Sequence, residues 1–116
     1  QIMKIQIGNA IFQVSLANNE TAAAFRTLLP MTITMNELNG NEKYYNLSSE
    51  LPTDAYRPGT IRAGDLLLYG SNCVVLFYET FSSPYSYTRI GRVDDPTGLA
   101  EAVGSGRVSV TFSLQE

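Results

Sequence analysis

Two continuous apolar runs lie in the middle of the chain, at residues 66–68 and 74–78. The residues that join them, 69–72, include Gly70 and Asn72, so this spacing predicts a β-hairpin. Strands that face solvent on one side alternate apolar and polar residues, whereas these two runs do not alternate. We therefore expect both faces of this hairpin to be covered, one by the core and the other by a helix or a partner.

Alternating apolar and polar residues mark several other strands. Residues 3–7 alternate, Gly8 and Asn9 supply a turn, and residues 12–16 resume the alternation, which predicts a second hairpin with one apolar face. Further strands are predicted at residues 31–35, 43–47, 87–93 and 108–112. Such strands are typical of the wall of an antiparallel sandwich or barrel.

Two helices interrupt this series of strands. Either Asn18 or Asn19 can cap the first helix, which continues through an apolar stripe and ends at Pro30. The second helix is predicted to begin at Asp95 as its N-cap, with Pro96 in its first position, and to run through residue 103. From patterning alone the chain is a β-rich domain with two helices.

Composition narrows the class of protein. The chain has 116 residues, 44% hydrophobic and 16% charged, which describes one ordinary globular domain over residues 1–116. A net charge of −3 and scattered basic residues argue against a nucleic-acid partner. No apolar run approaches the roughly 20 residues that cross a bilayer, so no transmembrane segment is predicted. The chain starts at Gln1 rather than Met, and a leader removed before it would make the domain extracytoplasmic; localisation is otherwise open.

The chain offers few groups for catalysis or metal binding. It contains no histidine, so a nucleophilic triad lacks its usual base and transition metals lack their commonest ligand. Cys73 is the only cysteine, and its place beside valines in a strand favours a buried structural role. Asp94 and Asp95 form the best carboxylate pair, but helix capping accounts for them. We therefore predict no cofactor and no metal site.

Aromatic residues and one long loop supply the candidate binding surface. Pro52, Pro58 and Gly59 break up residues 48–63, and loops of this length in compact domains commonly carry function. The chain has seven tyrosines and no tryptophan. They fit packing in the wall of a barrel, or a groove on its outer face that holds an extended peptide or a small planar ligand, with residues 81–87 as its lip.

Several segments resemble known proteins. The first helix reads LANNETAAAFRTLLP and is similar to the T-A-x-x-F helix of cyclophilins, and the later segment IGRVDDPTGLAEAVGSG is similar to their passage from strand to helix. The segments LLPMTITMNELNGNEKYYNL and AGDLLLYG resemble the bacterial cyclophilin-like family of small domains. This resemblance covers nearly the whole chain. It implies a mainly β fold, a closed antiparallel cyclophilin-like β-barrel capped by two short α-helices.

The resemblance bears on function residue by residue. Peptidyl-prolyl isomerases of this fold use an arginine followed by F-x-x-Q-G-G and a pocket histidine, and this chain has neither the motif nor the histidine. Phe77 falls where cyclophilins place a pocket phenylalanine, and Tyr87 falls near the place of the histidine. Arg57 and Arg62 lie in the loop nearest the usual position of the arginine. The comparison therefore argues against an enzyme without deciding the question.

Three hypotheses follow. In the favoured one the domain is non-catalytic and binds a peptide or small apolar ligand on an aromatic outer face of the barrel. The residues proposed for this face are Phe77, Tyr45, Tyr85, Tyr87, Arg57 and Arg62. In the second, the domain is a weak peptidyl-prolyl isomerase in which Arg57 or Arg62 polarises the prolyl nitrogen and Phe77 seats the proline ring. In the third, it is a structural protein-interaction module whose exposed strands pair with a partner. The oligomeric state is left open.

Overall fold

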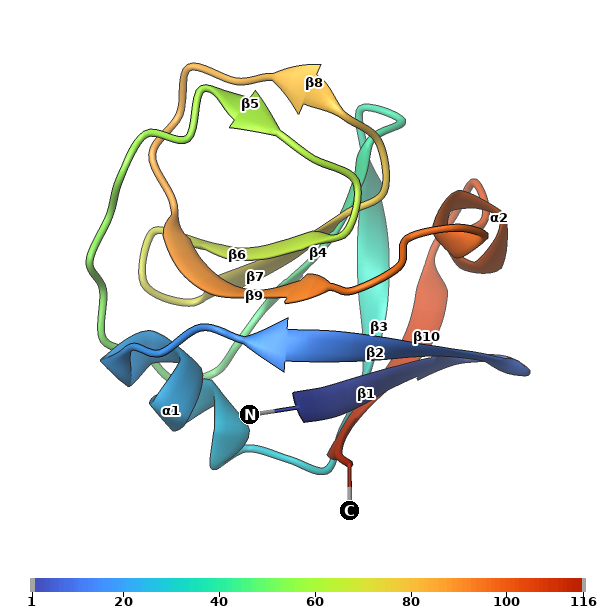
Figure 1. The fold of residues 1–116 in the computed structure, drawn as a ribbon, viewed down its shortest axis with the longest axis horizontal. Helices are drawn as coiled ribbons and strands as arrows, with labels where there is room; N and C mark the ends of the chain where they lie inside the picture. The colour runs from blue at the N-terminus through green and yellow to red at the C-terminus, as the bar shows by residue number, and fades with distance from the viewer. Residues whose placement is uncertain (1, 116) are drawn as a thin grey trace.

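A computed structural model describes residues 2–115 and contains ten strands and two short helices (Figure 1). In chain order the elements are β1 (Ile2–Ile7), β2 (Ala10–Leu16), α1 (Glu20–Arg26), β3 (Met31–Leu38), β4 (Glu42–Asn46), β5 (Thr60–Ile61), β6 (Asp65–Tyr69), β7 (Cys73–Phe77), β8 (Phe81–Ser82), β9 (Thr88–Val93), α2 (Leu99–Val103) and β10 (Val108–Leu114). Within residues 2–115, neither helix has the length and apolar character needed to cross a membrane.

Eight of the strands form a closed antiparallel barrel, which confirms the predicted fold class. Their order around the barrel is β1-β10-β3-β4-β7-β6-β9-β2, and the pairing of β2 with β1 closes it. Ile5 faces Phe112 across β1 and β10, and the Gln115 backbone N–H donates to the carbonyl oxygen of Ile2 at 3.4 Å beyond that pair. Closure leaves the wall without a free edge.

The interior of the barrel is filled by the apolar faces of the alternating strands. Met3, Ile5 and Ile7 of β1 point inward and are buried, and β10 contributes Val110 and Phe112. The helix α1 adds Phe25, whose ring lies edge-on to Phe112 at 5.6 Å between centroids. The two helices lie at opposite sides of the barrel (Figure 1).

The strands β6 and β7 are buried on both faces, as their apolar runs predict. Leu66 and Leu76 belong to the interior core, whereas Leu67, Val75 and Phe77 belong to a second apolar cluster on the outer face. The predicted cover was a helix or a partner, and this part of the prediction is wrong. The cover is a two-stranded sheet of β5 and β8, carried by two loops of the chain itself (Figure 1).

This cover is called the flap below and consists of β5, β8 and residues 83–85. Ile61 pairs with Phe81 across its two strands, and the Ser83 backbone N–H donates to the carbonyl oxygen of Gly59 at 2.8 Å. Strands of two residues carry no alternation that a sequence pattern can reveal. For this reason residues 48–63 and 81–85 were both predicted as loop.

The first helix begins as predicted and the second does not. Asn19 Oδ1 accepts a hydrogen bond from the Ala22 N–H at 2.7 Å, so Asn19 is the N-cap of α1. Asp95 is not the N-cap of α2, because its Oδ1 accepts from the Thr97 N–H and forms a local turn instead. Gly98, with φ at 83°, then starts the helix three residues later than predicted.

Candidate functional site

A groove of about 520 Å³ lies on the outer face of the barrel over β4 and β7. Its sides are the β3–β4 turn and the flap, and its floor is the barrel wall. Most of its lining is aromatic or aliphatic, and the residues are Leu38, Asn39, Glu42, Tyr44, Tyr69, Cys73, Val75, Phe81, Ser82, Ser83, Pro84, Tyr85 and Tyr87. The groove has the size and composition typical of small-ligand clefts.

Aromatic rings form a continuous series along this groove. Tyr69 contacts both Tyr85 and Tyr87, with centroid distances of 6.0 Å and 5.7 Å. Tyr87 in turn lies edge-on to Phe77 at 5.6 Å, and Phe77 contacts Phe81 of the flap at 5.7 Å. The series therefore joins the exposed rim of the groove to the buried cluster beneath the flap, and the mutual contacts restrict how far each ring can turn.

The rim of the groove leaves large side chains open to solvent. Tyr85 is 57% exposed and Tyr69 is 47% exposed, and Leu38 on the opposite side is 43% exposed. Single exposed apolar residues are ordinary on protein surfaces, whereas several around one concave groove are typical of a binding site.

Glu42 places a carboxylate in this mostly apolar groove. Its position in β4 is opposite Phe77 of β7, so both side chains project from the outer face of the wall. Only 8% of Glu42 is exposed, and within residues 2–115 its carboxylate has no hydrogen bond and no ion pair. Burial, together with the charge of Glu37, raises the pKa of Glu42 above its ordinary value.

Cys73 is half-buried in the floor of the same groove. Burial and the nearby charge of Glu42 raise the pKa of its thiol, so it forms little thiolate at neutral pH. This environment agrees with the structural role predicted for Cys73 and gives no support to a reactive nucleophile.

Lys43, the next residue along β4, is fully buried on the inner side of the wall. Its Nζ lies 2.9 Å from Glu37 Oε1 and donates to the carbonyl oxygens of Gly104 and Gly106 at the end of α2. Tyr78 Oη donates to Glu37 Oε1 at 2.8 Å, and the Tyr78 ring lies 5.4 Å from the lysine nitrogen. These contacts make a closed polar network that fixes the β3–β4 hairpin to the segment after α2.

The network sets the ionisation of its members. Burial alone would raise the pKa of Glu37, but hydrogen bonds from Lys43, Tyr78 and the Gly40 N–H outweigh it and lower that pKa below its ordinary value. Burial and the hydrogen bond to Glu37 raise the pKa of Tyr78 to about 12. The lysine is therefore part of a structural ion pair that lies apart from the groove.

The structure distributes the sequence-predicted site residues over different surfaces. Tyr85 and Tyr87 line the groove, and Phe77 lies beneath it, fully covered by the flap. Tyr45 packs against the interior core, on the other face of the wall. Arg57 and Arg62 are exposed, and neither belongs to the lining of the groove within residues 2–115.

Sequence analysis missed Glu42, Tyr44 and Tyr69 as groove residues. Glu42 and Tyr44 are two residues apart in β4 and share one face, which the alternation of a strand implies. That alternation does not show which face is outside. The signal in the sequence was an acidic residue two positions before a tyrosine, with the glutamate just outside the strand predicted at residues 43–47 and inside the observed β4.

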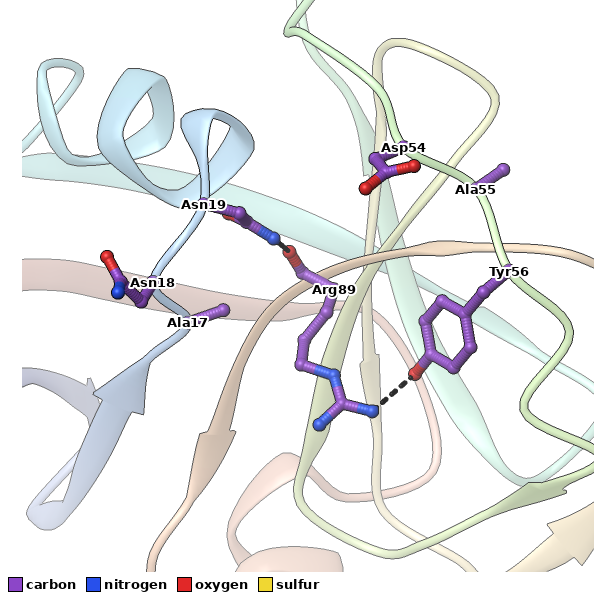
Figure 2. A pocket seen from close by; sticks show the side chains of 7 residues that line it. All are labelled: Ala17, Asn18, Asn19, Asp54, Ala55, Tyr56 and Arg89. Carbon is purple, nitrogen blue, oxygen red and sulfur yellow. Dashed lines mark hydrogen bonds between the residues drawn. The ribbon is translucent and has the colours of Figure 1, made fainter.

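A second hollow, of about 400 Å³, lies between the start of α1 and the loop that carries Tyr56 (Figure 2). Three of the polar side chains around this hollow already form hydrogen bonds within the protein. Arg89 Nη2 donates to Tyr56 Oη at 3.0 Å, and Asn19 Nδ2 donates to the carbonyl oxygen of Arg89 at 2.8 Å, as Figure 2 shows. The hollow has one aromatic ring in its lining, whereas the groove has a series of them, so we place the candidate site in the aromatic groove.

The acidic and sulfur-bearing side chains of the described residues are dispersed. Among residues 2–115, no three His, Cys, Asp or Glu side chains lie together in the way that a metal site needs. The groove itself offers one carboxylate and one thiol with a raised pKa, Glu42 and Cys73. Its chemistry is thus that of an apolar surface with a single acidic group.

Comparisons with known proteins bear on this fold. The model of the cyclophilin-like family matches residues 5–113. The solution structure of a hypothetical protein from Archaeoglobus fulgidus is similar in fold, with a TM-score of 0.64 and 20% sequence identity over 98% of this chain and 94% of that one. The comparison with curated proteins gives no match. With the family model matching almost its full length, the chain belongs to the cyclophilin-like family.

Proposed function

We propose that this domain is a non-catalytic binding module that holds a small apolar ligand or a peptide in the aromatic groove on the outer face of its barrel. The observation that carries the proposal is the groove itself: about 520 Å³, lined by four tyrosines, with exposed rings at its rim. A ligand that covered Tyr69 and Tyr85 would remove their apolar surface from water, which favours binding.

The structure beneath the groove supports this use. The floor is built from β4 and β7 of a closed barrel, and the side is a flap whose own ring, Phe81, contacts Phe77. A site held by packed strands loses little conformational freedom when a ligand binds. The nearby thiol and amine are poor nucleophiles here, since burial raises the pKa of Cys73 and Lys43 is paired with Glu37 on the inner side of the wall.

A neutral apolar fluorophore, N-phenyl-1-naphthylamine, tests the proposal. Its emission rises when it leaves water, so titration with the domain measures binding to an apolar groove. We expect saturable binding that is weakened about three- to tenfold by Tyr85→Ala, because one aromatic contact contributes about 0.5–1.5 kcal/mol. Tyr69→Ala is expected to act in the same direction.

The matched control is Ile11→Ala on β2, because Ile11 is 58% exposed and Tyr85 is 57% exposed. Both variants remove a large exposed side chain, but only one removes it from the groove. Absence of saturable binding, or an equal loss in the Ile11 variant, would contradict the proposed site.

A further inference from the structure

The fold treats the two glutamates of one hairpin, the partly exposed Glu37 and the buried Glu42, in opposite ways. The Glu37 carboxylate has Lys43 at 2.9 Å, the Tyr78 hydroxyl at 2.8 Å and the Gly40 N–H at 2.6 Å. Glu42, five residues after Glu37 in the facing strand, has no such partner within residues 2–115. Within residues 2–115, the Glu42 carboxylate oxygens keep some contact with solvent, so the unpaired acid opens on the groove. An acid in a cleft whose charged form is disfavoured by burial is a candidate for a functional site.

The surroundings of Glu42 favour a positive charge. Four tyrosines line the same groove, and the faces of aromatic rings attract cations. The ring centroids of Tyr69 and Tyr87 lie 5.7 Å apart, and their ring planes are tilted by 57°. The ring planes of Tyr69 and Tyr85 are nearly perpendicular, at 84°. Rings that meet at such angles present faces and edges around one space, as in sites that hold ammonium groups.

We propose that the ligand of the groove is a small organic cation, an ammonium group carried on an apolar body. Its charge lies against the Glu42 carboxylate, and its apolar body lies among Tyr44, Tyr69 and Tyr85. This inference rests on the proposed function and adds the chemical class of the ligand. A groove of about 520 Å³ lies within the usual range for small molecules, roughly 300–1,000 Å³, which favours a small cation over a long peptide.

A matched pair of probes separates charge from apolar contact. 2-Phenylethylamine is a cation at neutral pH, and 2-phenylethanol has nearly the same shape without the charge. Binding of each is followed by backbone amide shifts in NMR, with Tyr44 and Cys73 as reporters of the groove. We expect the amine to bind at least about tenfold more tightly than the alcohol, because only the amine can form a charge-assisted hydrogen bond with the Glu42 carboxylate.

Two variants assign this difference to one carboxylate. Glu42→Gln keeps the shape of the side chain and removes its charge, so the amine and the alcohol are expected to bind alike. Glu101→Gln makes the same change on the exposed surface of α2 and is expected to keep the preference for the amine.

The outcomes distinguish this inference from the proposed function. Equal binding of amine and alcohol to the unmodified domain would overturn the cation and leave the apolar groove in place. Failure of both probes and of the neutral fluorophore to bind would overturn the groove itself. A Gly-Lys-Gly tripeptide with blocked ends is the last probe. If this peptide binds in a way that depends on Glu42 and the amine does not bind, the small-molecule ligand is rejected. The ligand would then be a lysine side chain of a peptide.

Discussion

Glu42 and Lys43 are neighbours in β4 whose charged ends lie on opposite sides of the barrel wall. Glu42 faces Phe77 and the groove, whereas Lys43 is paired in register with Leu76 and lies inside. The lysine has its partner in Glu37, whereas the glutamate has none among residues 2–115. One strand thus carries Lys43, whose charge is paired and stabilises the fold. Its neighbour Glu42 carries a charge that is available to a ligand in the groove.

The inner charge is expected to be essential for stability. Lys43→Met removes the charged partner of the Glu37 carboxylate and the donor to the carbonyl oxygens of Gly104 and Gly106. Losing hydrogen bonds to a charged group costs about 1.5–3 kcal/mol, which urea denaturation will measure. Arg107→Met, at an exposed position, is the control and should change the free energy of unfolding little. A loss below about 1 kcal/mol in the Lys43 variant would contradict the network.

The outer charge is expected to cost stability as the pH rises. Because folding raises the pKa of Glu42 above its ordinary value of 4.5, the folded state holds that proton more tightly, and stability falls as the pH increases through the folded pKa. Glu42→Gln should therefore be more stable than the unmodified domain at pH 7, with a smaller difference below pH 4.5. Urea midpoints at both pH values measure this.

Other ionisable groups near Glu42 act outside this window. The pKa of Glu37 lies below 4.5, so its contribution to stability is lost only as the pH falls further. Cys73 and Tyr87 have pKa values raised above 9.0 and 10.0. If Glu42→Gln and the unmodified domain show the same change in stability between the two pH values, the carboxylate is not destabilised by burial.

The thiol in the groove reports the same charge by a different route. Burial and Glu42 raise the pKa of Cys73, so alkylation by iodoacetamide should be slow at pH 8. Glu42→Gln should speed alkylation several-fold, because it removes the nearby negative charge and increases the thiolate fraction. Since Cys73 is the only cysteine, the mass of the intact protein gives the rate directly. Equal rates in Glu42→Gln and Glu101→Gln would show that the charge of Glu42 does not reach the thiol.

One glycine is required where β9 passes between β2 and β6. A Cβ at Gly91 would lie 2.6 Å from the carbonyl oxygen of Ser15, which belongs to the backbone of the facing strand. Gly91→Ala is therefore expected to destabilise the barrel by about 1–3 kcal/mol. Gly106→Ala is the matched control, because a Cβ there meets nothing within 4 Å. Thermal unfolding of the two variants measures the difference, and equal melting temperatures would contradict the close approach.

The sequence allowed most of the barrel to be predicted because the signals for its strands and first helix are local. Alternation in β1 and β2, the double burial of β6 and β7, and the cap at Asn19 each depend on a few neighbouring residues. The flap was not predicted because a strand of two residues is defined only by its pairing with another segment, which the local sequence does not show. The predicted start of α2 was wrong because an aspartate side chain can accept a backbone hydrogen bond in a turn as well as at a helix N-cap, and Asp95 does so in a turn.

The candidate site was harder to predict because it depends on which alternate residues of each strand face outward and on how the strands are paired in register. Tyr44 and Tyr45 must lie on opposite faces of β4, but the sequence does not show which one points outward. The natural guess places a lysine outside. Here Lys43 lies inside with its ion pair, so Tyr45 follows it inward and Tyr44 lines the groove. Lys43 donates to the Gly104 carbonyl oxygen, 61 residues away along the chain. Only this distant partner shows which face of β4 points into the barrel.

The hydrogen bond from Gln115 to Ile2 brings the two described ends of the backbone together beside β1 and β10. The path of the chain is therefore almost a ring. A short linker could join these ends, and the chain could be opened instead at the turn of Gly8 and Asn9. The strands would then be synthesised in a different order. All strand pairings would be preserved, and only the covalent connection between β1 and β2 would be lost. The barrel, with its groove and its unpaired glutamate, is thus suited to circular permutation and to insertion into an exposed loop of another protein.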